Sequence, residues 1–258
     1  MHRRLMINVQ AELDRIRRKL RAPAGAVEAP PALPQDFSAF TRRLIRRCKP
    51  FTMTSVERLA VLEQAVRHIC RHRIDGAVVE CGVGLGGSMM AAASVLRELG
   101  ETERDLYLFD TYSGMPRPTA ADVSVRGKKA IVQYRKRSRN GKSDWICYSR
   151  EEVEATMERS GYDFCRLHFV EGMVEETLPS CDIDRIALLR LDTDWYDSTR
   201  VEMRVLYPKL APGGLLIVDD YNRWLGSRNA VDEYFAENGV RMFLGRIDDH
   251  AVVGVKPG

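Results

Sequence analysis

Short apolar runs alternate with longer amphipathic stretches over most of the chain. The apolar runs predict buried strands at 77–81, 105–109, 167–170, 186–191 and 215–218, and two further strands near 241–244 and 251–255. The stretches between them predict helices at 55–72, 88–99, 151–159, 198–210 and 229–237. Strands that alternate with helices form a mostly parallel, doubly wound sheet, and two successive strands at the end predict one antiparallel edge. The predicted fold class is therefore α/β.

Two segments do not follow this alternation. Residues 4–21 have helical spacing, with apolar positions on one stripe and arginines opposite, and the proline-rich stretch 22–34 ends that helix. We therefore predict an N-terminal basic helix and linker over 1–35 and a main domain over 36–258. The apolar stripe is expected to pack on a partner subunit of a homo-oligomer or on its own domain. The polar excursion 112–149 is longer than a simple connection between two elements requires, so it predicts a lid or a substrate loop.

Composition and charge exclude several classes of partner. The net charge of +4 hides three basic segments at 1–21, 36–49 and 126–142, and the remainder of the chain is acidic. A nucleic-acid-binding domain carries its positive charge on the folded face, so nucleic acid bound by the basic arm and loop is only a rival hypothesis. The chain has no apolar run of about 20 residues and no secretory signal, so we expect a cytoplasmic protein without a membrane partner. Six single cysteines predict reduced thiols.

A glycine-rich turn follows the first predicted strand. It contains Glu80, Gly82, Gly84, Gly86, Gly87 and Ser88. Gly82, Gly84 and Gly87 fit GxGxxG, which is typical of dinucleotide sites, and we place Gly82 and Gly84 among the cofactor-binding residues. Glu80 can accept from a ligand ammonium, and Asp110 at the end of the second strand can accept from two ribose hydroxyls. A dinucleotide site would also use Asp110, so it is Glu80, together with the metal-binding carboxylates described below, that favours S-adenosylmethionine. A nicotinamide-dependent dehydrogenase, or glycines needed only for a tight turn, are the alternatives.

Three carboxylates close two later apolar runs. Asp192 follows 186–191, and Asp219 with Asp220 follows 215–218. If both runs are neighbouring parallel strands, these side chains meet at one rim of the sheet. Mg²⁺ is commonly held by two or three carboxylates with open positions, and without a cation the three would raise one another's pKa. We predict a Mg²⁺ site, with simple helix capping as the alternative. Asp248 and Asp249 close no such run and are expected at the surface.

Six stretches occur in an order typical of one enzyme family. They are FTMTSVERL (51–59), VVECGVGLGGS (78–88), LYLFDTYSGMP (106–116), EETLP (175–179), LRLDTDWYDST (189–199) and GGLLIVDDYNRW (213–224). Together they resemble the macrocin O-methyltransferase family over residues 50–240. The resemblance implies the class I S-adenosylmethionine-dependent methyltransferase fold, with a seven-stranded sheet and helices on both faces. It also implies a magnesium-dependent enzyme that methylates deoxysugar hydroxyls in antibiotic biosynthesis, and hence a glycoside as the small-molecule substrate.

The resemblance implies roles for individual residues. The cofactor would lie against Met53, Thr54, Glu80, Gly82, Ser88, Asp110, Gly172 and Met173, and Mg²⁺ would be held by Asp192, Asp219 and Asp220. A substrate hydroxyl bound to Mg²⁺ becomes more acidic. Asp194 is expected to take its proton, because a continuing strand would point it along the same side as Asp192.

Some features leave the base and the acceptor open. At least one relative has a histidine three residues after the first metal aspartate, where this chain has Trp195; His168 and His250 are the alternative bases. The basic excursion, with Tyr134 and Trp145 for stacking on a ring, is expected either to cover the acceptor or to be a solvated loop. A small catechol-like phenol is the alternative acceptor.

Overall fold

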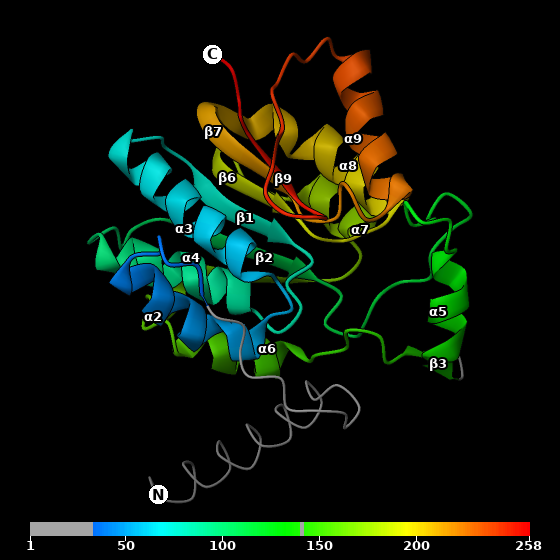
Figure 1. Ribbon diagram of the computed structural model, residues 1–258, viewed down its shortest axis with the longest axis horizontal. Coiled ribbons are helices and arrows are strands. Elements are labelled where there is room, and N and C mark those ends of the chain that lie inside the picture. The colour runs from blue at the N-terminus through cyan, green and yellow to red at the C-terminus, as the bar shows by residue number, and fades with distance from the viewer. Residues whose placement is uncertain (1–32, 140–141) are drawn as a thin grey trace, which may run out of the picture.

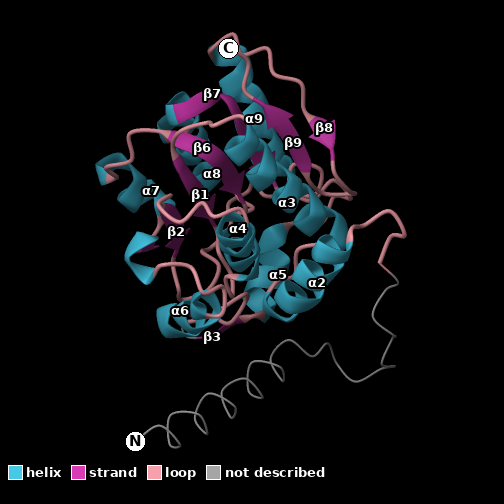
Figure 2. Cartoon of the chain, turned by 90° about the vertical axis from the view of Figure 1, so that its left-hand side faces the viewer, coloured by secondary structure: helices cyan, strands magenta, loops and turns pink. Residues whose placement is uncertain are grey.

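The computed structural model describes residues 33–139 and 142–258 (Figure 1). Its central sheet contains β1 (Ala77–Cys81), β2 (Leu106–Asp110), β5 (Leu167–Glu171), β6 (Ile186–Leu191), β7 (Leu210–Val218), β8 (Gly245–Arg246) and β9 (Val252–Val255). The strand order is β5-β2-β1-β6-β7-β9-β8. Neighbouring strands are parallel, except that β9 runs antiparallel to both β7 and β8. Figure 2 shows β9 between these two strands.

Helices cover both faces of the sheet. The main helices are α2 (Ala39–Cys48), α3 (Val56–Arg71), α4 (Gly87–Glu98), α6 (Arg150–Glu158), α7 (Val174–Thr177), α8 (Tyr196–Val205) and α9 (Leu225–Glu237). Figure 1 shows α2, α3 and α4 on one side of the sheet and α8 and α9 on the other. Every position of β1 and β6 is buried, as expected for central parallel strands covered on both faces.

Alternation along the strands divides the core into two halves. Val78 and Leu188 belong to the apolar cluster beneath α2, α3 and α4, whereas Val79 and Leu189 belong to the cluster beneath α8 and α9. Successive side chains of a strand point to opposite faces, so this division follows directly from the period of two. The same rule places Glu80 and Arg190, two residues further along, on the α3 and α4 side.

The predicted architecture is confirmed, with local corrections. The seven-stranded, mostly parallel sheet is present, and β1 and β6 have the predicted bounds. The antiparallel strand is β9, the second strand from the edge, and the strand expected at 241–244 is instead the short β8. Helix α2 was not predicted, because its arginine content read as a basic stretch. The predicted helix at 4–21 lies outside the described residues. None of the helices in 33–139 or 142–258 has the length and apolar character to cross a membrane.

The excursion 112–149 is attached to the body at several points. It contains α5 (Ala130–Lys136) and a hairpin of β3 (Ser138–Arg139) and β4 (Lys142–Ser143), which stand to one side of the sheet (Figure 1). Its residues 123–125 run beside 223–225: the Leu225 N–H donates to the Val123 carbonyl at 2.8 Å, and the Val125 N–H donates to the Arg223 carbonyl at 3.0 Å. The excursion is therefore fixed beside the segment that follows Asp220.

Candidate active site

The glycine turn after β1 lies directly against the chain that follows β6. The Asp192 N–H donates to the Cys81 carbonyl at 2.8 Å. Gly82 has φ +82°, and a Cβ at this position would lie 2.2 Å from the Asp192 carbonyl oxygen. Gly84 also has a positive φ, but a Cβ there would meet only Ile146 at 3.9 Å. Gly82 is thus required for space as well as for conformation, since it lets the turn contact the edge of the sheet where β6 and β7 end. We call this edge, with Asp192, Asp194, Asp219 and Asp220, the carboxylate rim.

Asp110 braces this turn. Its Oδ2 accepts from the backbone N–H groups of Val83 and Gly84 at 2.7 and 3.1 Å, and its Oδ1 accepts from the Tyr112 N–H at 2.9 Å. Burial raises the pKa of Asp110, and these backbone hydrogen bonds oppose that rise. A carboxylate has about four acceptor positions, so the predicted contact with ribose hydroxyls remains compatible with this geometry.

A buried arginine that was not predicted lies at the centre of the site. Arg190 is the last residue but one of β6 and lies in register with Glu80 on β1. Its side chain is only 4% exposed. Its guanidinium donates to Glu80, to Asp219 and, at 2.8 Å, to Asp192. The signal in the sequence was an arginine within the apolar run 186–191. Removing one partner of such a buried network costs about 3–5 kcal/mol, because it leaves a charge uncompensated.

A second arginine reaches the rim from α3. Arg58 donates to Asp219, and its Nε donates to Asp248 at 2.8 Å. Arg58 stands where a capping box would have glutamate. Its backbone N–H and its Nε both donate to the hydroxyl of the N-cap Ser55, at 3.1 and 3.3 Å. Burial alone would raise the pKa of Asp248, but hydrogen bonds from Ser55, Ala251 and His250, together with Arg58, lower it to about 2. Asp248 is therefore a structural ion-pair residue, which corrects the expectation of a plain surface acid.

The rim brings three carboxylates together. Ligand oxygens of Asp192, Asp194 and Asp220 lie within 4.8 Å of one another. Asp194 arrives there by a turn: β6 ends at Leu191, and Asp194 has φ +70°. The expectation that a continuing strand orients Asp194 is therefore wrong, although its carboxylate does lie beside Asp192. A positive φ at a residue other than glycine stores backbone strain of about 1–3 kcal/mol, and such strain clusters at functional sites.

The rim carboxylates have unusual protonation properties. Burial raises the pKa of Asp194 to about 6, while its hydrogen bond with Asp220 opposes that rise. Burial also raises the pKa of Asp220, and the neighbouring Asp194 raises it further. The Oδ1 of Asp220 is buried without a hydrogen-bond partner, and Arg223 Nε lies 3.7 Å away. An orphaned carboxylate oxygen of this kind indicates a place for a cation or a donor.

The charges around Arg190 do not balance. Six carboxylates gather with three guanidinium groups, which belong to Arg58, Arg190 and Arg223; the carboxylates are those of Glu80, Asp192, Asp194, Asp219, Asp220 and Asp248. Even when Asp194 and Asp220 share one proton, a negative excess remains in a largely buried region. Excess negative charge at low dielectric favours a bound cation.

The remaining predicted residues surround the turn. Thr54 is buried, with its hydroxyl 3.3 Å from that of Ser88 and accepting from Arg190 at 3.1 Å. Met53 is 63% exposed and therefore accessible to a ligand. Gly172 follows β5, and its N–H donates to the Asp110 carbonyl at 3.0 Å; Met173 caps α7. The structure thus gathers the predicted cofactor residues around the ends of β1, β2 and β5.

The two alternative bases lie in different places. His168 Nε2 contacts Asp105 Oδ1 at 2.9 Å, just ahead of β2 and so at the opposite end of the sheet from the rim. This position argues against His168 as the base. His250 lies in the turn between β8 and β9, where its backbone N–H donates to Asp248 at 2.8 Å. Burial and the nearby Arg223 and Arg58 lower its pKa.

Three tryptophans fix the excursion beside the rim. Trp195 packs edge-on against Trp145 and Trp224, with ring centroids 5.6 and 5.2 Å apart. The Trp195 Nε1 donates to the Pro116 carbonyl at 3.1 Å. Trp145 is only 5% exposed within this cluster, so it is not free to stack on an acceptor as suggested by the sequence. Trp195, which stands where a relative has histidine, instead serves as the centre of the cluster.

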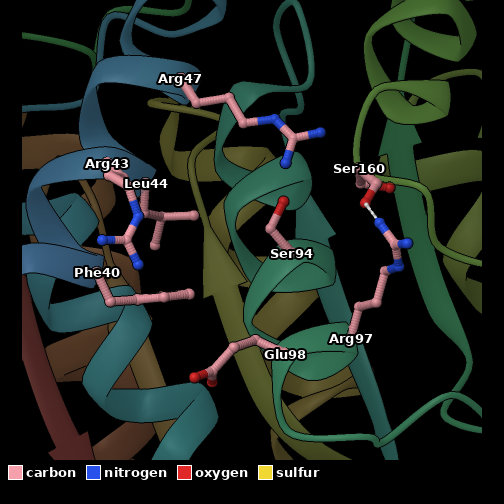
Figure 3. A pocket seen from close by; sticks show the side chains of 8 residues that line it. All are labelled: Phe40, Arg43, Leu44, Arg47, Ser94, Arg97, Glu98 and Ser160. Atoms are coloured by element: carbon pink, nitrogen blue, oxygen red, sulfur yellow. Dashed lines mark hydrogen bonds between the residues drawn. The ribbon is translucent and has the colours of Figure 1, made fainter.

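A separate hollow lies between α2 and α4 (Figure 3). Its volume is about 520 Å³, and it is lined by Phe40, Arg43, Leu44, Arg47, Ser94, Arg97, Glu98 and Ser160. None of these residues belongs to the predicted site.

Comparison with known proteins places the chain among O-methyltransferases. The macrocin O-methyltransferase family matches residues 35–255. The chain is 33% identical over 201 residues to the 8-demethyl-8-(2,3-dimethoxy-α-L-rhamnosyl)-tetracenomycin-C 4′-O-methyltransferase of Streptomyces olivaceus, covering 78% of this chain and 74% of the relative. It is 31% identical over 240 residues to the demethyldecarbamoylnovobiocin O-methyltransferase of Streptomyces niveus, covering 89% and 88%. The solved structure of the O-methyltransferase NovP matches with a TM-score of 0.74 and 25% identity, covering 97% of this chain and all of NovP.

Proposed function

The chain belongs to the macrocin O-methyltransferase family, and we propose that it transfers a methyl group from S-adenosylmethionine to a sugar hydroxyl of a glycosylated natural product, with Mg²⁺ at the carboxylate rim. The relatives support the acceptor class, since one is named for a rhamnosyl-tetracenomycin and the other for a demethyldecarbamoylnovobiocin. The observation that carries the proposal is the contact between the glycine turn and the rim, which joins a cofactor site to a group of carboxylates.

The cofactor side provides acceptors for a cationic ligand. Glu80 is fully buried, its Oε1 accepts from Arg190, and its Oε2 has no hydrogen-bond partner. Burial raises the pKa of Glu80 to about 7, while Arg190 opposes that rise, so an incoming ammonium group would stabilise the ionised form. Thr54 and Ser88 supply hydroxyls next to it. We propose that this region holds the methionine end of S-adenosylmethionine.

The rim fits a divalent cation. Asp192 keeps one oxygen free of Arg190, and Asp220 Oδ1 has no hydrogen-bond partner. We propose these two as ligands. Asp219 is the proposed third ligand: its two oxygens accept from Arg58 and Arg190, and a carboxylate has about four acceptor positions, so two remain. A divalent cation held there supplies Lewis acidity, which lowers the pKa of a hydroxyl beside it.

Asp194 is the proposed proton acceptor. A general base must lie within reach of the proton that it takes. The Asp194 carboxylate has an oxygen within 4.8 Å of those of Asp192 and Asp220, and its hydrogen bond to Asp220 holds it next to the proposed ligands. The strained backbone at Asp194 and the tryptophan cluster that begins at Trp195 fix its position.

A methyl-transfer assay tests the proposed function. The purified protein is incubated with S-adenosylmethionine and a panel of glycosylated acceptors, first with Mg²⁺ and then after chelation. Transfer to a sugar hydroxyl that stops on chelation and returns with Mg²⁺ is expected. Transfer that survives chelation would contradict the metal role. Tight binding of NADH without a response to S-adenosylmethionine would contradict the cofactor.

Asp194→Asn tests the proton acceptor. Turnover is expected to fall by about 10²- to 10⁴-fold, while the affinity for S-adenosylmethionine is retained. Asp249→Asn, in an exposed residue paired with Arg246, is the matched control and should leave turnover unchanged. Unchanged turnover in Asp194→Asn would remove this residue from the mechanism. The homo-oligomer remains a prediction, which sedimentation would test.

A further inference from the structure

One guanidinium group joins the cofactor side of the site to the carboxylate rim. Arg190 Nη1 donates to Glu80 Oε1 and, at 2.8 Å, to Asp192 Oδ2. Its Nη2 donates to Asp219 Oδ1 and, at 3.1 Å, to the Thr54 hydroxyl. Two of these acceptors belong to the proposed cofactor site and two to the proposed cation site. Among the described residues, only Arg190 forms ion pairs both with Glu80 on the cofactor side and with Asp192 and Asp219 on the cation side.

The strand register creates this arrangement. Arg190 pairs with Glu80 on β1 and with Ile217 on β7. Asp192 lies two residues beyond Arg190, and Asp219 lies two residues beyond Ile217, so both follow positions on the same face of the sheet. The guanidinium group is therefore held between three strands, at the point where their carboxylates converge.

We propose that Arg190 is a positioning residue, which fixes the cofactor acceptor Glu80 and the cation ligands Asp192 and Asp219 in a single arrangement. This inference rests on the proposed function. The guanidinium contacts each carboxylate from one side: Glu80 Oε2 and Asp192 Oδ1 accept no hydrogen bond from it. Arg190 thus orients Glu80 for the cofactor and Asp192 for the cation, and it leaves one oxygen of each carboxylate available to that ligand.

Holding several carboxylates in fixed directions at once requires the planar guanidinium group of arginine. The guanidinium group presents several donors in fixed directions, whereas the ammonium group of lysine is a point charge on a flexible stem. Arg190→Lys therefore keeps the charge and loses the geometry. Arg190→Met removes both.

Charge and positioning predict opposite results. If Arg190 acted only as a positive charge, its removal would tighten binding of a cation, because like charges repel. If it positions the ligands, its removal weakens cation binding despite the more negative site. Partners that orient metal ligands typically contribute about 10- to 100-fold in metal affinity.

The experiment measures the binding of two ligands by calorimetric titration. They are Mn²⁺, as a substitute for Mg²⁺, and S-adenosylmethionine. Arg190→Lys is expected to weaken both by about 10- to 100-fold, with circular dichroism unchanged. Arg190→Met is expected to weaken Mn²⁺ binding as well. Arg67→Lys is the matched control, since Arg67 pairs with Glu63 and Glu98 away from the site. It should bind both ligands as the wild type does.

A second variant covers the case in which both replacements at Arg190 fail to fold. Thr54→Val removes one acceptor of Nη2 on the cofactor side and leaves every charge in place. Through the shared guanidinium it should weaken Mn²⁺ binding severalfold, which a purely local contact with Ser88 would not do.

Several outcomes would overturn the inference. Wild-type affinities for both ligands in Arg190→Lys, tighter Mn²⁺ binding in Arg190→Met, or unchanged Mn²⁺ binding in Thr54→Val would each exclude the positioning role while leaving the proposed function intact. A wild-type protein that binds neither ligand would overturn the proposed function, and this inference with it.

Discussion

The glycine turn and the carboxylate rim lie in contact, yet they are built in different ways. The turn is local: Gly82 and Gly84 adopt backbone conformations that glycine permits, and Asp110 on the adjacent strand accepts from the N–H groups of Val83 and Gly84. The rim is assembled from distant segments, since Arg58, Arg190 and Asp219 come from α3, β6 and the end of β7. Sequence spacing can therefore describe the turn, whereas the rim depends on which strands become neighbours.

Because of this difference, the two regions should be sensitive to different kinds of substitution. Strain or a clash threatens the turn, because its glycines have positive φ and Gly82 has no room for a side chain. Loss of a charge partner threatens the rim, because its buried carboxylates depend on two guanidinium groups. Four predictions test this distinction, from the largest expected effect to the smallest.

Gly82→Ala should damage both regions. Its Cβ would lie 2.2 Å from the Asp192 carbonyl oxygen, so the turn and the rim would have to separate. We expect a loss of about 4 kcal/mol or more in the free energy of unfolding, or failure to fold. Gly100→Ala is the control: φ is +75°, but nothing lies within 4 Å, so only about 1–2 kcal/mol should be lost. Equal losses in urea unfolding would show that space at Gly82 does not matter.

Glu202→Gln should reveal the cost of a buried acid beneath the rim. Glu202 is fully buried and accepts from the Thr193 hydroxyl at 2.8 Å, and burial raises its pKa from 4.5 to about 8. The folded state therefore binds more protons than the unfolded state between pH 4.5 and 8, so wild-type stability falls as the pH rises through this window. The variant removes this dependence.

The difference between Glu202→Gln and the wild type is the quantity to measure. As the pH rises from 5 to above 8, we expect the variant to gain about 4–5 kcal/mol of stability relative to the wild type and then to reach a plateau, because each unit of pKa difference is worth about 1.4 kcal/mol. Urea unfolding at each pH measures it. A difference independent of pH would show that Glu202 titrates normally in the folded protein.

Asp219→Asn and Asp194→Asn should separate the ligands from the base. If Asp219 is the third ligand, its replacement weakens Mn²⁺ binding by about 10- to 100-fold, whereas Asp194→Asn leaves Mn²⁺ binding nearly unchanged and lowers turnover. The reverse pattern would assign the third position to Asp194, whose carboxylate lies within 4.8 Å of those of Asp192 and Asp220. Calorimetric titration with Mn²⁺ distinguishes the two.

Gly84→Ala should have the smallest effect. Gly84 has φ +55°, and a Cβ would meet only Ile146 at 3.9 Å, so the cost is conformational alone. We expect a loss of about 1 kcal/mol in the free energy of unfolding and no change in Mn²⁺ binding. A loss as large as that of Gly82→Ala would mean that the whole turn, rather than one position, is tightly packed.

Particular residues show how far the sequence could predict this structure. The bounds of β1 and β6 followed from apolar runs, because strands covered on both faces have continuous apolar sequence. Helix α2 did not, because it has no acid in its first turn and its arginines hide a narrow apolar face. Trp145 was a candidate for stacking on the acceptor, with a solvated loop as the alternative, but burial of three large rings against one another proved more favourable than exposing one of them.

The sequence by itself determined the alternation of strands and helices, the glycine turn and the clustering of aspartates at strand ends. These features depend on local spacing, on backbone conformations that glycine allows and on the rule that parallel strands end at one rim. Only the tertiary structure decided that Arg190 faces Glu80, that Arg58 reaches Asp219 and that Asp194 turns back towards Asp220. Those contacts depend on strand register and helix packing, which bring together residues far apart in the chain.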